Sequence, residues 1–180
     1  MRMPLRSMAL FLAASARAPL LAQAAPADTL RSATVIAAAR DIMQAARYCT
    51  LITIGADGRP QARIVDPFPP DSDLTIWIAT NPLTRKVQDI RRDARVTLLY
   101  FSAATSEYVT VLGTAAPDTS AQAKAGHWKS VWASLYKKQN RGDDYLLLRV
   151  KPSRLEVVSI RRGISNDPKT WRPVSVDIRP

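Results

Sequence analysis

The chain has 180 residues, of which 47% are hydrophobic and 23% charged, and its formal net charge is +11. This length and composition are typical of one globular domain and exclude a disordered chain. One cysteine and one histidine exclude an intrachain disulfide, a multi-cysteine zinc site and a two-histidine metal helix. The basic charge leaves nucleic acid, an anionic membrane surface and small phosphorylated ligands open as partners.

Residues 1–24 predict an export signal. Arg2 and Arg6 give a basic start, residues 8–16 are apolar, and residues 22–24 offer a small-x-small cleavage site. We therefore expect an exported, periplasmic protein; the alternative is a cytoplasmic protein with an N-terminal extension. No later stretch approaches the ~18 consecutive apolar residues of a membrane helix, so we expect no membrane span in the mature chain.

The first elements after the signal are a helix and a hairpin. Apolar residues recur at helical spacing over 32–47. Residues 48–54 are rich in β-branched and aromatic side chains and predict a strand, which turns at Asp57-Gly58 and returns over 61–65. Cys49 lies within this apolar run, which indicates a buried structural thiol.

A third strand over 73–80 leads directly into a helix over 82–92. Asn81 is a good N-cap residue, and Pro82 would occupy the first helical position, where no N–H is needed. Arg85 and Lys86 would then lie in the first turns of this helix. A helix N-terminus already favours anions through its free N–H groups and its dipole.

The rest of the chain predicts more strands than helices. We expect strands over 95–101 and 107–115, a helix from 119 to about 138, and strands over 145–150 and 154–160. The predicted fold is mainly β with flanking helices (α+β): an antiparallel sheet closed into a small barrel. The chain has no glycine-rich dinucleotide fingerprint and no Walker loop.

Four polar residues would converge if the second and third strands are neighbours. Arginine offers a bidentate fork, lysine a point charge and threonine a hydroxyl donor, so together they would bind a phosphate dianion. The alternative is that the two helix cations are ordinary solvated charges. The four residues are Arg63, Thr80, Arg85 and Lys86.

Residues from about 35 to 160 resemble the split-barrel flavoproteins of the pyridoxamine 5′-phosphate oxidase superfamily, especially the general stress protein branch. The resemblance rests on short motifs in a fixed order. They are Asp57-Gly58-Arg59-Pro60, Ala62-Arg63, Ile78-Ala79-Thr80-Asn81, Thr84-Arg85-Lys86-Val87, Asp93-Ala94-Arg95-Val96, Tyr108 to Ala115, and Leu146 to Pro152.

The resemblance implies an antiparallel split β-barrel that forms a homodimer and binds FMN at the subunit interface. Arg63, Arg85 and Lys86 match positions that hold the FMN phosphate. The full implied set of cofactor-binding residues is Arg63, Thr80, Thr84, Arg85, Lys86 and Tyr108. Tyr108 stands where the oxidase has a glutamine, Ala79 replaces a common aromatic residue, and the oxidase's C-terminal Arg-x-His element is absent.

The sequence therefore predicts a signal peptide at 1–24, a split-barrel flavin-binding domain at 25–160 and a C-terminal tail at 161–180. We expect an FMN-dependent oxidoreductase that acts on a small molecule, and no nucleic-acid partner. The alternative is a non-catalytic module that binds flavin, deazaflavin or haem, or that binds no cofactor. The sequence identifies no catalytic residue, substrate or electron donor. Trp171 in the tail would cover the partner's flavin; the alternative is a tail that is simply docked or disordered.

Overall fold

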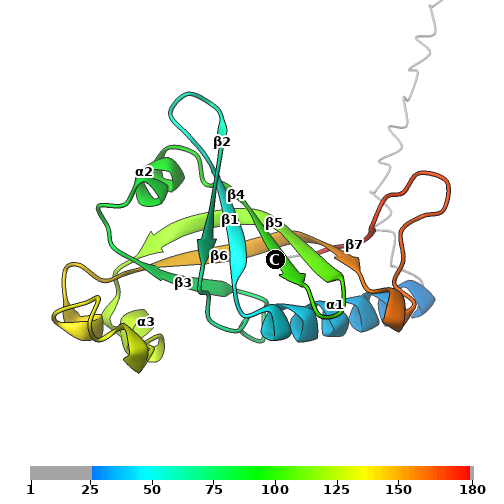
Figure 1. The fold of residues 1–180 in the computed structure, drawn as a ribbon, viewed down its shortest axis with the longest axis horizontal. Helices are drawn as coiled ribbons and strands as arrows, with labels where there is room; N and C mark the ends of the chain where they lie inside the picture. Colours follow the sequence, from blue (N-terminus) through cyan, green and yellow to red (C-terminus); the bar gives the residue numbers. More distant parts are fainter. Residues whose placement is uncertain (1–25, 179–180) are drawn as a thin grey trace, which may run out of the picture.

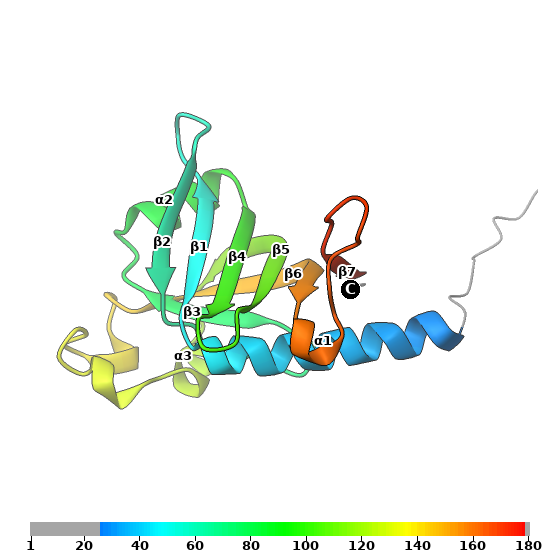
Figure 2. The same cartoon turned by 45° about the vertical axis from the view of Figure 1, so that its right-hand side comes forward.

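The structure, a computed structural model, describes residues 26–178, and the predicted export signal lies outside that part of the chain. The helices are α1 (Pro26–Ala46), α2 (Arg85–Arg92) and α3 (Ala121–Gly126), and the strands are β1 (Cys49–Ile54), β2 (Pro60–Val65), β3 (Ile76–Thr80), β4 (Arg95–Ser102), β5 (Glu107–Asp118), β6 (Leu146–Val158) and β7 (Val174–Asp177). In both views α1 runs beneath the strands, and α2 lies at their opposite ends (Figures 1 and 2).

All seven strands belong to one antiparallel sheet with the order β2-β1-β4-β5-β6-β3, and β7 pairs with β6. The sheet curls until the segment after β2 meets β3, where the Phe68 amide donates to the Trp77 carbonyl at 2.9 Å. The strands β2 and β3 themselves do not pair, so the barrel is split between them. This confirms the predicted antiparallel split barrel with flanking helices.

The hairpin β1–β2 forms as the sequence predicts. Cys49 pairs with Val65 and Ile54 with Pro60, so the strands stay in register to the turn. Gly58 adopts a φ of +75°, which glycine tolerates and most side chains do not. Side chains of β1 alternate between buried and half-buried, as expected for a strand with one core face.

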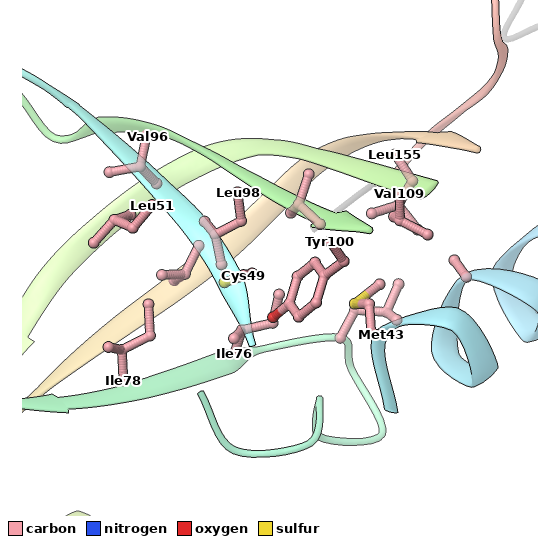
Figure 3. Packing of buried hydrophobic residues seen from close by; sticks show 14 of the residues in the cluster. Met43, Cys49, Leu51, Ile76, Ile78, Val96, Leu98, Tyr100, Val109 and Leu155 are labelled. Carbon is pink, nitrogen blue, oxygen red and sulfur yellow. The ribbon is translucent and has the colours of Figure 1, made fainter. Parts of the chain in front are cut away.

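The core lies between the sheet and α1. Ala39, Ile42 and Met43 of α1 are buried against Leu51, Leu98 and other inward residues of the strands. Figure 3 shows Tyr100 of β4 directed into this core beside Met43, with Cys49 nearby. Cys49 is buried, as predicted, and burial raises the pKa of its thiol to about 12.

Two predicted strands prove to be one. The sequence suggested a break at Lys151-Pro152-Ser153, but β6 runs through it from Leu146 to Val158. Pro152 lies opposite Gly113 of β5, next to a register shift, and proline is tolerated at such irregular positions. A Cβ on Gly113 would lie 2.2 Å from the Lys151 carbonyl oxygen, so this close strand contact requires glycine.

The predicted helix over 119–138 is wrong beyond its first turns. α3 ends at Gly126, and short 3-10 turns follow at Ser130–Trp132 and Gln139–Arg141. The apolar side chains of this segment do not face the main core. Trp128 and Trp132 instead pack with Tyr136 in a separate aromatic cluster around Trp77 of β3 and Tyr145, the residue before β6. Ring-to-ring packing of these bulky residues replaces a continuous helical face.

A buried carboxylate joins the sheet to the C-terminal segment. Glu107, at the start of β5, accepts a hydrogen bond from Ser159 and lies 2.9 Å from the Arg161 guanidinium. Arg162 lies 3.5 Å from the same carboxylate and 3.0 Å from Asp41 of α1. The hydrogen bond from Arg161 lowers the pKa of Glu107 to about 2, although burial opposes this shift.

This carboxylate makes stability depend on pH. Unfolded Glu has a pKa of about 4.3, so between about pH 5 and pH 2 the unfolded chain binds more protons than the folded one. We expect the free energy of unfolding to fall across this range as the pH is lowered. In urea titrations, the stability advantage of the native protein over Glu107→Gln should shrink between pH 5 and pH 2. A difference that stays constant down to pH 2 would contradict this role.

Candidate functional site

The predicted phosphate-binding residues meet where the split between β2 and β3 opens toward α2. Arg63 comes from β2, Thr80 ends β3, and Arg85 and Lys86 begin α2. β2 and β3 are the two edge strands of the main path of the sheet, so both sides of the site are strand edges. We call the region formed by Arg63, Thr80, Thr84, Arg85 and Lys86 the anion cradle.

The helix begins three residues later than predicted. Thr84, not Asn81, occupies the N-cap position of α2, and Pro82 lies in the preceding turn. Asn81 instead uses its side-chain oxygen to accept from the Leu83 amide at 2.9 Å. Because of this shift, Arg85 and Lys86 are the first two helical residues, where backbone N–H groups have no partner within the helix.

Two threonine hydroxyls connect β3 to the start of α2. The Thr84 hydroxyl donates to the Asn81 carbonyl at 2.8 Å, and the Thr80 and Thr84 hydroxyl oxygens are 3.2 Å apart. Since Thr84 has already used its hydrogen, Thr80 is the donor of this pair. The buried Thr80 thus fixes the N-cap of α2 against the end of β3.

A relay of side chains holds Arg63. Its guanidinium donates to the Thr53 hydroxyl at 2.7 Å, and Thr53 donates to the Asp89 carboxylate at 2.9 Å. Arg63 also approaches Asp89 directly at 3.6 Å, and only 20% of its side chain is exposed. Arg92 donates to the other oxygen of Asp89 at 3.1 Å. Asp89 is therefore the buried anchor that orients the cradle arginine.

The cradle carries more positive than negative charge. Burial lowers the pKa of Lys86, and the neighbouring Arg63 lowers it further. Burial also lowers the pKa of Arg63, Asp89 opposes this shift, and Arg85 adds to it. Within the described residues neither Arg85 nor Lys86 has an ion-pair partner. Three mutually repelling cations beside free helix amides would be stabilised by an anion.

Sequence reasoning missed Asp89 and Thr53. Asp89 is buried on α2 together with Val87 and Ile90, and Thr53 is a buried hydroxyl on β1. One signal for Asp89 was available: it lies between two inward-facing apolar residues and three residues after Lys86, on the side of the helix that approaches the sheet. Nothing in the sequence indicated that the Thr53 hydroxyl would accept a hydrogen bond from Arg63.

The structure does not bring Tyr108 to the cradle of the same chain. Leu51 pairs with both Arg63 and Leu98, and Leu98 pairs with Val111, which places Tyr108 about 10 Å further along β5. Tyr108 also points to the opposite face of the sheet from the buried Val111.

The single histidine is a packed residue. The His127 ring stacks on Trp77 with 4.6 Å between centroids and meets the edge of Phe68 at 5.0 Å. Its Nδ1 atom lies 2.8 Å from the Ala123 carbonyl oxygen. Across residues 26–178 no group of three or more His, Cys, Asp or Glu side chains is arranged to hold a metal ion, and no helix is long and apolar enough to cross a membrane.

Comparison with known proteins gives one family and one fold. The family model of pyridoxamine 5′-phosphate oxidase matches residues 35–159. A search of the curated proteins found no match.

A Clostridium acetobutylicum protein related to general stress protein 26 of Bacillus subtilis is similar in structure, with a TM-score of 0.66 at 15% identity, covering 82% of this chain and 96% of that chain. General stress protein 26 from Bacillus anthracis has a TM-score of 0.60 at 20% identity, covering 71% and 93%. A pyridoxamine 5′-phosphate oxidase-related, FMN-binding protein from Nostoc punctiforme has a TM-score of 0.53 at 16% identity, covering 87% and 98%. These likenesses establish the split-barrel fold.

Proposed function

The chain belongs to the pyridoxamine 5′-phosphate oxidase family, and on this premise we propose that it binds FMN through the anion cradle and acts as a flavin-dependent oxidoreductase on a small molecule. The observation that carries the proposal is the cluster of Arg63, Arg85 and Lys86 at the N-terminus of α2, where a single buried carboxylate offsets part of the charge. One structural relative is described as FMN binding.

The residues present fit a phosphate dianion. Arg63 is preorganised by Thr53 and Asp89, so binding an anion does not require it to become ordered first. Arg85 and Lys86 contribute charge and, through their position at the start of α2, backbone N–H donors. Thr84 holds this helix start in place through its hydrogen bond to the Asn81 carbonyl. An incoming phosphate would relieve the repulsion among the three cations.

A bound flavin would supply the hydride or electron chemistry through its ring, as redox cofactors do. The protein's own part is to bind and orient. The cradle would fix the phosphate end, and the edges of β2 and β3 would border the ring. His127 is held in aromatic packing, so we assign it no proton transfer. The proposal names no general acid or base.

We further propose a homodimer with the cofactor at its interface. The outer face of β2, β1 and β4 exposes a row of apolar side chains: Ile64 is 67%, Leu99 38% and Phe101 56% exposed. Register places Ile64 and Leu99 on either side of Thr50, so the patch is continuous across the three strands. Tyr108 pairs with Phe101 and lies on this face, from which it would reach the partner's cofactor.

Flavin titration tests the proposed cofactor site. FMN and riboflavin share a ring system and differ in the phosphate. Each charge-assisted hydrogen bond contributes about 1.5–3 kcal/mol, so we expect FMN to bind at least about a hundredfold more tightly than riboflavin. Quenching of flavin fluorescence measures both affinities. Equal affinities would show that the cradle does not hold the phosphate.

The alternative function is a binding module without turnover. A phosphate site at the cradle would suit a phosphorylated deazaflavin as well as FMN, and it would suit a protein that only carries its cofactor as well as an enzyme. Reduction of the flavin-loaded protein by NADPH or NADH, followed by absorbance, separates the two functions. We also retain the proposal of export, which the mass of the mature N-terminus tests.

A further inference from the structure

A cavity of about 320 Å³ lies between the C-terminal end of α1 and the proline-rich segment that follows β2. Met43 and Arg47 of α1, residues 67–70, Tyr100 of β4 and Lys129 line it. It shares no residue with the anion cradle. Protein interiors contain few voids much larger than a water molecule, and this volume is in the range of small-molecule sites. We call it the α1 cavity.

The walls of the α1 cavity are mostly apolar. Met43, the ring of Tyr100 and the prolines of residues 67–70 supply a hydrophobic surface. The Tyr100 hydroxyl at its inner end is buried without a hydrogen-bond partner within the described residues, apart from the weakly bonding Cys49 thiol beside it. Because most of the lining side chains are apolar, a ligand for this cavity would have an apolar body.

One of its two cations is held less firmly than the other. Lys129 lies 2.7 Å from the Asp66 carboxylate, donates to the Pro67 carbonyl, and sits over the rings of Phe68 and Trp132. Arg47 lies 3.9 Å from the same carboxylate, which Lys129 already holds, and 4.9 Å from the centre of the Tyr48 ring, and 62% of its side chain is exposed, so its guanidinium can turn toward a ligand. One available guanidinium at the mouth of an apolar cavity is complementary to a monoanion.

The backbone of Arg47 is also unusual. It follows the last residue of α1 and adopts a φ of +58°, and its N–H donates to the Met43 carbonyl at 3.2 Å. Glycine is the residue normally favoured at this left-handed helix end, and other residues there lose stability. An arginine at a glycine position places its side chain at the cavity mouth at a cost to folding. Such local strain is common at ligand-binding sites.

We propose that the α1 cavity binds a small apolar carboxylate. The apolar body would lie between Met43 and residues 67–70, and the carboxylate would accept a bidentate pair of hydrogen bonds from Arg47. This site goes beyond the proposed flavin function and does not depend on it, because none of its residues contributes to the cradle.

The test compares an acid with its neutral analogue by calorimetry on the purified protein. We expect 2-naphthoate to bind and 2-naphthalenemethanol to bind at least about tenfold more weakly, because the alcohol cannot pair with Arg47. In Arg47→Gly the affinity for 2-naphthoate should fall about tenfold or more. The same variant should melt about 3 °C higher, because glycine suits the left-handed backbone. If Arg47→Gly binds 2-naphthoate more weakly but melts at a higher temperature, Arg47 contacts the ligand and does not act by stabilising the fold.

Two further variants complete the test. Arg59→Gln removes an exposed cation from the β1–β2 turn and should leave 2-naphthoate binding unchanged. Gln44→Trp places a bulky ring on an exposed position at the cavity wall and should abolish binding. The proposal is overturned if the native protein binds neither 2-naphthoate nor benzoate, if acid and alcohol bind equally, or if Arg47→Gly binds 2-naphthoate as tightly as the native protein.

Discussion

Arg85→Ala combined with Lys86→Ala is expected to purify without colour and to bind FMN at least about a hundredfold more weakly than the native protein. Each lost contact to a phosphate removes about 1.5–3 kcal/mol, and two are removed together. The fold should not suffer, because within residues 26–178 neither side chain has an ion-pair partner. Removing charges that repel Arg63 should leave the melting temperature unchanged or slightly higher.

The matched control is Arg59→Ala combined with Arg91→Ala. It removes the same charge from exposed positions outside the cradle, on the β1–β2 turn and at the end of α2. This control should retain flavin, which would separate a local phosphate site from a general effect of net charge. If the Arg85→Ala/Lys86→Ala protein keeps one flavin per chain, the cradle is misassigned.

Asp89→Ala is expected to lower the free energy of unfolding by about 3 kcal/mol. The substitution removes the acceptor of Thr53 and Arg92 and the counter-charge of Arg63, and loss of one partner of a buried ion pair costs about 3–5 kcal/mol. The expected value lies at the lower end because Arg92 is half-exposed and can turn to water. Urea denaturation at neutral pH measures the loss.

Glu156→Ala serves as the comparison for Asp89→Ala. Glu156 is a partly exposed carboxylate on β6 that lies 3.4 Å from Arg154, and exposed pairs of this kind contribute about 1 kcal/mol or less. Similar losses for the two variants would show that Asp89 does not anchor Arg63 in the way described above.

The sequence predicted those parts of the fold that depend on local pattern. The hairpin around Asp57-Gly58 followed from strand alternation and turn chemistry, and the structure confirms it. Of the three cradle cations, Arg85 and Lys86 were predicted from their place at a helix start and Arg63 from its place on the second strand. We expected their convergence if β2 and β3 were neighbours. The two strands do not pair, and the residues converge because β2 and β3 are the two ends of a curled sheet.

The parts that the sequence did not predict depend on tertiary contacts. Apolar residues recur at helical spacing beyond Gly126, but Trp128 and Trp132 find aromatic partners in Phe68, Tyr136 and Tyr145 instead of a continuous core face. Asp89 and Thr53 are ordinary residues in sequence and become important only because strand register places Thr53 between Arg63 and α2. β7 lies in the predicted tail and gains its order from pairing with β6.

Native mass spectrometry of the purified protein, recorded after incubation with excess FMN and removal of free flavin, tests the central claim most directly. The account predicts one non-covalently bound FMN per chain in the native protein and in Arg59→Ala/Arg91→Ala. It predicts none in Arg85→Ala/Lys86→Ala. A native protein that carries no flavin, or a double cradle variant that carries as much as the native protein, would contradict it.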